Sequence, residues 1–268
     1  MLKRFRNGFG VFSLMEKLKR HGFLFEELVK RDFKKKYKRT VLGILWSMLA
    51  PLLTLLVMAI VFTEFFGRTT PHYIIYMFAG NLIFFYYRDA TSGGMTALVT
   101  NSSIFTKVNV PKYLFVFSKN VSSLINFALT LVIFFFFVAI DGIPFSWKFF
   151  MLIYPIVCLL IFNIGVGLIL SALFVIFKDI QYLYDVFSTM LMYLSAIFYT
   201  IDSYSLTMQY LFYLNPIFVY ITYFRTIVID NTVPSLSYHL LCAFYALAVM
   251  VIGGVIYKKY NYKFLYYV

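Results

Sequence analysis

Residues 41–66 read VLGILWSMLAPLLTLLVMAIVFTEFF and come just after a basic stretch, GFLFEELVKRDFKKKYKR, at residues 22–39. An apolar run of this length can cross a hydrocarbon core about 30 Å thick as a single helix. Lys and Arg gathered before such a run are typical of a cytoplasmic segment, because positive charge is retained inside. We therefore predict a membrane-spanning helix over 41–66, with the residues before it in the cytoplasm.

The composition extends this prediction to the whole chain. Hydrophobic residues make up 62% of the 268 and charged residues only 13%, with a mean hydropathy of +0.83. A soluble domain is nearer half apolar and a quarter charged, and a chain of this length cannot hide so much apolar surface in one core. We expect an all-α membrane protein, because a helix satisfies its own backbone polar groups in lipid.

Short polar turns divide the apolar sequence into six predicted spans. Their approximate bounds are 41–66, 72–100, 113–140, 149–177, 185–201 and 237–257. Residues 202–234 are too polar for an ordinary span and too apolar for a soluble loop, so we expect short re-entrant helices before the last span. The spans form a transmembrane domain over 41–268. Cytoplasmic termini place nearly all basic residues inside, as the positive-inside rule requires.

Residues 1–40 form a basic cytoplasmic arm that contains an amphipathic pattern. Apolar side chains recur there every four residues, which predicts a helix lying in the membrane interface. These side chains are Phe25, Val29, Phe33 and Tyr37. Such a helix serves either as a simple topology anchor or as a lever that transmits force.

The polar segment 101–112, NSSIFTKVNVPK, predicts about two turns of cytoplasmic helix between two long spans. An exposed pair formed by Ile104 and Phe105 would suit docking onto a cytoplasmic partner. An ordinary connector is the alternative interpretation.

Within the spans, Arg88 and Asp89 are the ionisable residues that are most costly to bury. Such residues are functional candidates, although a position near the end of a span also lets them reach water. Ser188, Ser195 and Tyr199 share one face of the fifth span. Polar faces of this kind pack against other helices or line a water-filled path.

No catalytic, cofactor-binding or metal-binding residue is expected. The histidines are scattered, and the two cysteines, Cys158 and Cys242, lie apart within apolar spans. A phosphate-binding nucleotide loop is missing, so energy for active transport must come from an ion gradient or from another subunit. The formal charge of +13 is not accompanied by a base-reading motif, so we expect no nucleic-acid partner.

The stretch ELVKRDFKKKYKRT running into VLGILWSMLAPLLTLLV closely resembles the opening of permease subunits of type-2 ATP-binding-cassette polysaccharide exporters. That family includes O-antigen and teichoic-acid export permeases and rhamnan-type streptococcal ones. The resemblance continues in FAGNLIFFYYRDATSGGMTALVTNSSIFTKVNVPK, LILSALFVIFKDIQYLYDVF and YLNPIFVYITYFR. It spans nearly the whole chain, although the stretch 202–207 (DSYSLT) lacks a proline that many relatives have.

The resemblance implies several site residues. A coupling helix that seats in the nucleotide-binding subunit would contain Asn101, Ile104, Phe105, Lys107 and Pro111. A second cytoplasmic turn would contain Lys178 and Asp179. Asn215 and Pro216 would belong to external re-entrant helices, followed by Arg225.

The family's architecture implies that two copies of the chain form one channel above two ATPase subunits, which would bind ATP and Mg²⁺. A lipid-linked glycan would then be exported across the bacterial plasma (inner) membrane. Candidates for the lining of its path are Phe62, Phe65, Asp89, Ser188, Tyr193, Ser195, Phe198 and Tyr199. Two other functions stay open at this point: an integral membrane transferase for polyprenyl-linked sugars, and a secondary transporter or channel.

Overall fold

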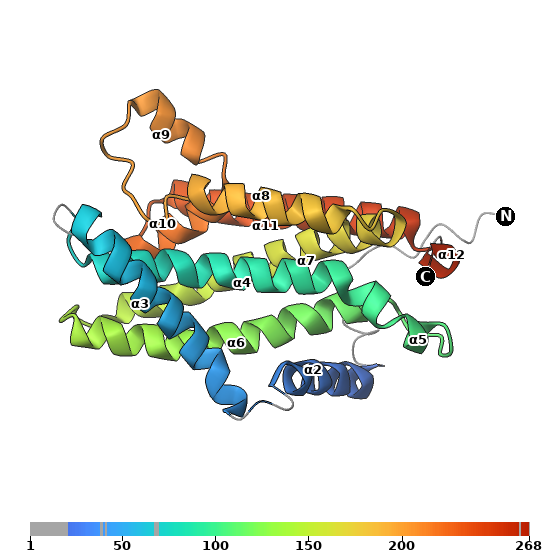
Figure 1. Cartoon of the computed structure of the whole chain (residues 1–268). Coiled ribbons are helices and arrows are strands. Elements are labelled where there is room, and N and C mark those ends of the chain that lie inside the picture. The colour runs from blue at the N-terminus through green and yellow to red at the C-terminus, as the bar shows by residue number, and fades with distance from the viewer. Residues whose placement is uncertain (1–20, 38–39, 41, 67–69, 263, 268) are drawn as a thin grey trace.

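Figure 1 shows the computed structural model, an elongated bundle of long helices with shorter helices at its two ends. The structure describes residues 21–37, 40, 42–66, 70–262 and 264–267, without the side chains of 36, 37, 44, 48, 64–66, 265 and 266. These residues form α-helices and two 3₁₀-helices and include no β-strand, which confirms the all-α prediction. The first half of the predicted arm, residues 1–20, lies outside the described part.

The elements up to the middle of the chain are α2 (Gly22–Tyr37), η1 (Gly43–Leu45), α3 (Trp46–Phe66), α4 (Tyr73–Thr100), α5 (Ser102–Phe105) and α6 (Tyr113–Ile140). The later elements are η2 (Trp147–Leu152), α7 (Ile153–Ile176), α8 (Ile180–Leu194), α9 (Leu206–Phe212), α10 (Pro216–Val228), α11 (Leu236–Tyr260) and α12 (Phe264–Tyr267).

Helix α4 is the centre of the bundle, with α6 and α7 packed against its length and α3, α8 and α10 in further contact. Most of its side chains are buried, and Phe78 meets Phe134 of α6 edge to face with 5.3 Å between ring centroids. Aromatic pairs of this geometry stabilise a core beyond the area that they bury. The apolar character of α4 therefore serves helix packing within the chain as well as contact with lipid.

Helices α7 and α11 pack closely through glycines. A Cβ atom added to Gly165 would lie 2.7 Å from the backbone nitrogen of Met250, and one added to Gly253 would meet the backbone of Gly165. Small residues let two helices approach to backbone contact, which is how many membrane helices associate.

The span prediction is supported only in part. Within the described part of the chain, three helical segments are long and apolar enough to cross a membrane, namely Tyr113–Ile140, Trp147–Ile176 and Leu236–Tyr260. A fourth candidate is the pair α9 and α10, which is bent by 100° at the break between the two helices and lies in the segment where re-entrant helices are predicted. The total of six spans stays a prediction.

The fifth predicted span, 185–201, needs a correction. Helix α8 covers 180–194 instead, because the polar stretch at 178–184 enters the helix and the chain leaves it after Leu194. Its 15 residues reach about 22 Å, short of a hydrocarbon core of roughly 30 Å.

The amphipathic helix forms where the four-residue repeat predicts it, but its most buried apolar side chain is Leu28, which lies beside that repeat. Leu28 is buried in a cluster with Phe105, Phe115 and Phe264, and α2 lies along α6. The predicted apolar side chains Phe25, Val29 and Phe33 are only half-buried, and the side chain of Tyr37 lies outside the described set. The position of α2 in a membrane interface stays a prediction.

Candidate functional site

A groove of about 900 Å³ lies over one face of α4. Residues at successive turns of α4 form its floor, from Asn81 through Phe85 and Asp89 to Ser92 and Thr96. Their spacing of three or four residues places them on the same side of the helix. The lining residues outside α4 come from α3 and α6, together with Asp185 of α8 and Thr40.

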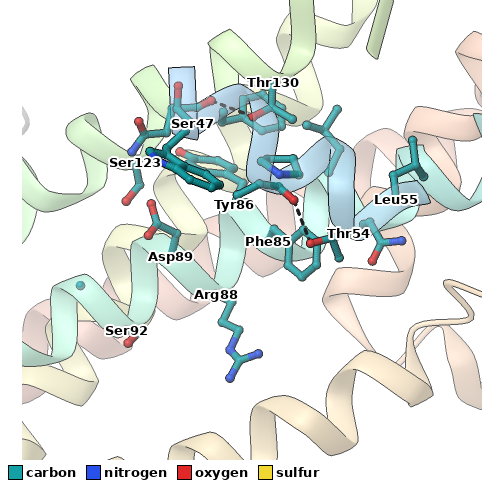
Figure 2. A pocket seen from close by; sticks show the side chains of 18 of the residues that line it. Ser47, Thr54, Leu55, Phe85, Tyr86, Arg88, Asp89, Ser92, Ser123 and Thr130 are labelled. Atoms are coloured by element: carbon teal, nitrogen blue, oxygen red, sulfur yellow. Dashed lines mark hydrogen bonds between the residues drawn. The ribbon is translucent and has the colours of Figure 1, made fainter. Parts of the chain in front are cut away.

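The groove is lined by polar groups that are unusual in so apolar a chain. Figure 2 shows Ser47 and Thr54 of α3 and Ser123 and Thr130 of α6 around α4. The Thr130 and Thr54 hydroxyls donate to backbone carbonyls one turn earlier, at 3.1 Å and 2.9 Å. These hydroxyl oxygens still have acceptor capacity, so the wall can form hydrogen bonds with a polar ligand.

Aromatic rings alternate with these polar groups. Trp46, Phe85, Tyr86 and Phe127 line the same groove. Hydroxyl and amide groups beside ring faces can bind sugars, because hydroxyls form hydrogen bonds while the C–H faces of the sugar stack on the rings. The combination is therefore suited to a carbohydrate chain more than to a purely apolar ligand.

Asp89 and Arg88 point in different directions from neighbouring positions of α4 (Figure 2). Adjacent helical residues are about 100° apart, which separates the two side chains. Arg88 is exposed and Asp89 half-buried, and both line the groove. Of the predicted path residues, Asp89 is the one that the groove contains.

A smaller cavity of about 320 Å³ continues the groove at the end where α2 packs. The two cavities share Asp89, Gly93, Thr96, Ser123 and Asn126 in their linings. Its other lining residues come from α2, α4 and α6 together with Asn101.

A charged network joins α2 to the rest of this smaller cavity. The carboxylate of Asp32, almost fully buried, accepts a 2.7 Å hydrogen bond from Nη2 of Arg31 and lies 3.3 Å from Nζ of Lys119 on α6. Arg31 Nη2 also donates to Oδ1 of Asn101 at 2.7 Å. Sequence reasoning missed this network, because its members are far apart in the chain and meet only after α2 docks.

The predicted docking segment has a different exposed surface from the one expected. Phe105 is buried and packs against Phe115 with ring centroids 6.0 Å apart, so the expectation of an exposed Ile104–Phe105 pair is corrected. Asn101 is buried too, and Ile104 and Pro111 are half-buried. The exposed tip is 106–109, which includes Lys107 and Val108.

Lys112 ties this segment to the end of the chain. Its Nζ donates to the carbonyl of Asn261 at 3.0 Å and lies 5.7 Å from the ring centroids of both Phe105 and Phe264. Partial burial lowers the pKa of the Lys112 amine below its usual value. Lys178 and Asp179, at the start of α8, are exposed.

The other predicted path residues whose side chains are described lie outside the groove. Phe198 stacks on Phe62 of α3 with ring centroids 4.8 Å apart and also approaches Tyr193. Tyr199 contacts the rings of Tyr204, just before α9, and Phe212, the last residue of α9. Ser188 and Ser195 are fully buried inside the chain, and the side chain of Phe65 is outside the described set.

Arg225 of α10 is a buried clamp at the end where α9 lies. It donates to the carbonyls of Tyr76, Ala196 and Ile197 at 3.1, 2.9 and 3.0 Å, and its guanidinium lies 3.4 Å from the Tyr76 ring centroid. The side chain thus fixes the segment that follows α8 to α4. Helix α10 itself begins at Asn215, whose Oδ1 accepts from the backbone of Ile217, a favourable N-cap.

Among the described residues, no group of three or more His, Cys, Asp or Glu side chains could hold a metal ion. Cys158 and Cys242 are both buried with free thiols.

Comparison with known proteins identifies the family of this chain. Residues 24–229 match the model of the ABC-2 type transporter membrane family. The chain belongs to that family. The match confirms the resemblance to type-2 ATP-binding-cassette permeases that the sequence showed. Membership of this family indicates that the chain is a membrane subunit of a transporter.

The chain is also similar to proteins named O-antigen export system permease protein RfbA. The one from Myxococcus xanthus is 27% identical over 234 residues, covering 84% of this chain and 87% of that protein. One from Klebsiella pneumoniae is 24% identical over 250 residues, covering 91% and 95%. A second from the same species is 23% identical over 252 residues, with the same coverage.

Proposed function

We propose that this chain is the transmembrane subunit of an ATP-driven exporter that moves a lipid-linked polysaccharide across the bacterial plasma membrane. The polar and aromatic groove along α4 carries the proposal, because a hydrophilic polymer needs such a surface to cross lipid. The similarity to O-antigen export permeases supports a glycan as the cargo, of O-antigen or teichoic-acid type.

A second copy of the chain would complete the conduit. The groove is open on one side, and α8 beside it exposes an apolar face that includes Val186, Phe187 and Met190. Two such faces brought together would bury apolar surface and enclose the two grooves as one path. The homodimer is thus the arrangement in which each chain supplies half of the wall.

Two copies of a separate ATPase subunit would supply the energy. The exposed tip at 106–109 and the turn at Lys178 and Asp179 are available to dock such a partner, which would hold ATP and Mg²⁺. Phe105 lies beneath that tip and packs against Phe115 of α6. A displacement of the tip by the ATPase would therefore be transmitted through Phe105 to α6.

The basic character of residues 22–39 supports a cytoplasmic location for α2 and for both chain termini in the plasma membrane. A polyprenyl-sugar transferase is the less favoured function, because such an enzyme needs clustered acidic or histidine side chains. The described residues contain no cluster of that kind large enough for a metal.

Filling the groove tests this function. A Cβ atom on Gly93 would meet only Lys119 atoms at 3.8 Å, an ordinary contact, so Gly93→Phe places its ring in the open groove without backbone strain. We expect this variant to assemble with its ATPase but to lose most glycan export. Val132→Phe, which adds bulk at an exposed position of α6, is the control and should export normally. Normal export by Gly93→Phe would refute the proposal.

A further inference from the structure

The smaller cavity at the α2 end has a chemistry of its own. Three cationic side chains line it, those of Arg31, Lys35 and Lys119, against two carboxylates, Asp32 and Asp89. Hydroxyl groups on α4 and α6 complete the wall, namely Thr96, Thr100, Ser122 and Ser123. The lining therefore carries an excess of positive charge, and Ser122 and Ser123 add neutral hydrogen-bond donors. The hydroxyls of Thr96 and Thr100 donate to backbone carbonyls of α4 instead.

The cations are held in place rather than dispersed in solvent. Asp32, almost fully buried, pairs with both Arg31 and Lys119, and Asn101 accepts a second hydrogen bond from Arg31. Among the described residues, Lys35 has no carboxylate within ion-pair distance. Arg31 and Lys119, both fixed by Asp32, thus line the same cavity as Lys35. This arrangement of cations is suited to binding an anion.

We propose that this cavity binds the phosphate ester that joins the lipid carrier to the glycan, an inference that rests on the proposed function. Lys and Arg, with the hydroxyls of Ser122 and Ser123, match the acceptor oxygens of phosphate or diphosphate. The cavity volume of about 320 Å³ is at the lower end of the usual range for small-molecule sites, roughly 300–1,000 Å³.

Continuity with the groove gives the site its place in transport. Gly93, Thr96 and Ser123 line both cavities. A phosphate bound beside Lys35 and Lys119 would therefore place an attached sugar chain at the end of the groove where α2 packs. A divalent cation fits less well, because Asp32 already pairs with two cationic side chains. The cavity would then recognise the junction that every substrate shares, whatever its sugar sequence.

The test uses the full chain, purified in a detergent without phosphate, and farnesyl diphosphate as the probe. Fluorescence-based titration should show saturable binding that is roughly tenfold weaker for Lys35→Gln and for Lys119→Gln, because each removes a charged hydrogen-bond donor. Lys34→Gln is the matched control, since Lys34 is also exposed on α2 but lines neither cavity. Its affinity should equal that of the parent chain.

Three further results decide the inference. Farnesol, which has no phosphate, should not bind, and binding as tight as that of the diphosphate would overturn the proposal. An equal loss of affinity in Lys34→Gln would overturn it as well. Inorganic pyrophosphate is then tested as a competitor of farnesyl diphosphate, to distinguish a lipid-linked phosphate from a soluble one. Weak competition supports a lipid-linked ester as the ligand. Competition as strong as that of unlabelled farnesyl diphosphate overturns the lipid-linked ester in favour of soluble phosphate. Because neither ATPase nor glycan is present, failure here is distinct from failure of export.

Discussion

Replacing Arg225 with Met tests the buried clamp between α10, α4 and the segment after α8. The guanidinium donates to three carbonyls at 2.9–3.1 Å and is almost fully buried. Hydrogen bonds from a charged donor contribute about 1.5–3 kcal/mol each, so an additive sum for the three reaches about 4.5–9 kcal/mol.

The structure reduces that sum. The carbonyl of Tyr76 lies inside α4 and keeps its helical hydrogen bond. The Tyr76 hydroxyl is 3.4 Å from the carbonyl of Ala196, but its single proton is donated to the carbonyl of Tyr199 at 2.8 Å. The carbonyls of Ala196 and Ile197 lose their Arg225 donors, whereas removing the buried charge also removes its desolvation cost. We therefore expect Arg225→Met to lower the free energy of unfolding by about 2–4 kcal/mol.

The assay is reversible denaturation of the purified chain in detergent, together with amide hydrogen exchange of 195–205. Exchange in this segment should accelerate more than exchange in α6, because the segment loses its attachment to α4. Thr226→Val is the control, since the Thr226 hydroxyl donates only within its own helix, to the Thr222 carbonyl at 2.9 Å. The reasoning is refuted if Arg225→Met unfolds at the same denaturant concentration as the parent and exchanges normally.

Two further predictions concern helix packing. Gly253→Ala should lower the free energy of unfolding by about 1–3 kcal/mol, because its Cβ would overlap the backbone of Gly165. Gly93→Ala, whose Cβ would make only ordinary contacts with Lys119 at 3.8 Å, should be neutral or stabilising in the same denaturation assay. Asp32→Ala should free α2 from α6, and spin labels on the two helices should report a broader distance distribution; an unchanged distribution would contradict the role of the Asp32–Lys119 pair.

Local sequence patterns predicted most of the helical framework. Helix α6 forms over the predicted 113–140, and the Asn215-Pro216 pair marks the start of α10, because Asn caps a helix and Pro is favoured at its first position. The predicted bounds of the fifth span, 185–201, were wrong, because α8 covers 180–194. A short polar stretch such as 178–184 can form either a loop or an exposed first turn of a helix. Local sequence does not distinguish the two.

The candidate site was predicted less completely. Asp89 was found because an ionisable residue within an apolar run is conspicuous. The polar face of α6 that includes Ser123, Asn126 and Thr130 also has a spacing of three and four residues, a signal that could have identified the groove wall. The burial of Phe105 and the Asp32–Lys119 pair depend on how α2 and α6 dock, which no local pattern specifies.

Water access along α4 is the most direct measure of the conduit. With Cys158 and Cys242 buried, single cysteines introduced as Ser92→Cys and Thr96→Cys can be probed with a charged, membrane-impermeant thiol reagent in vesicles. Both should react from the aqueous phase, and a cysteine placed at the exposed apolar position Val132 of α6 should remain unmodified. If Ser92→Cys and Thr96→Cys prove as unreactive as the cysteine in place of Val132, the groove is not a hydrated path.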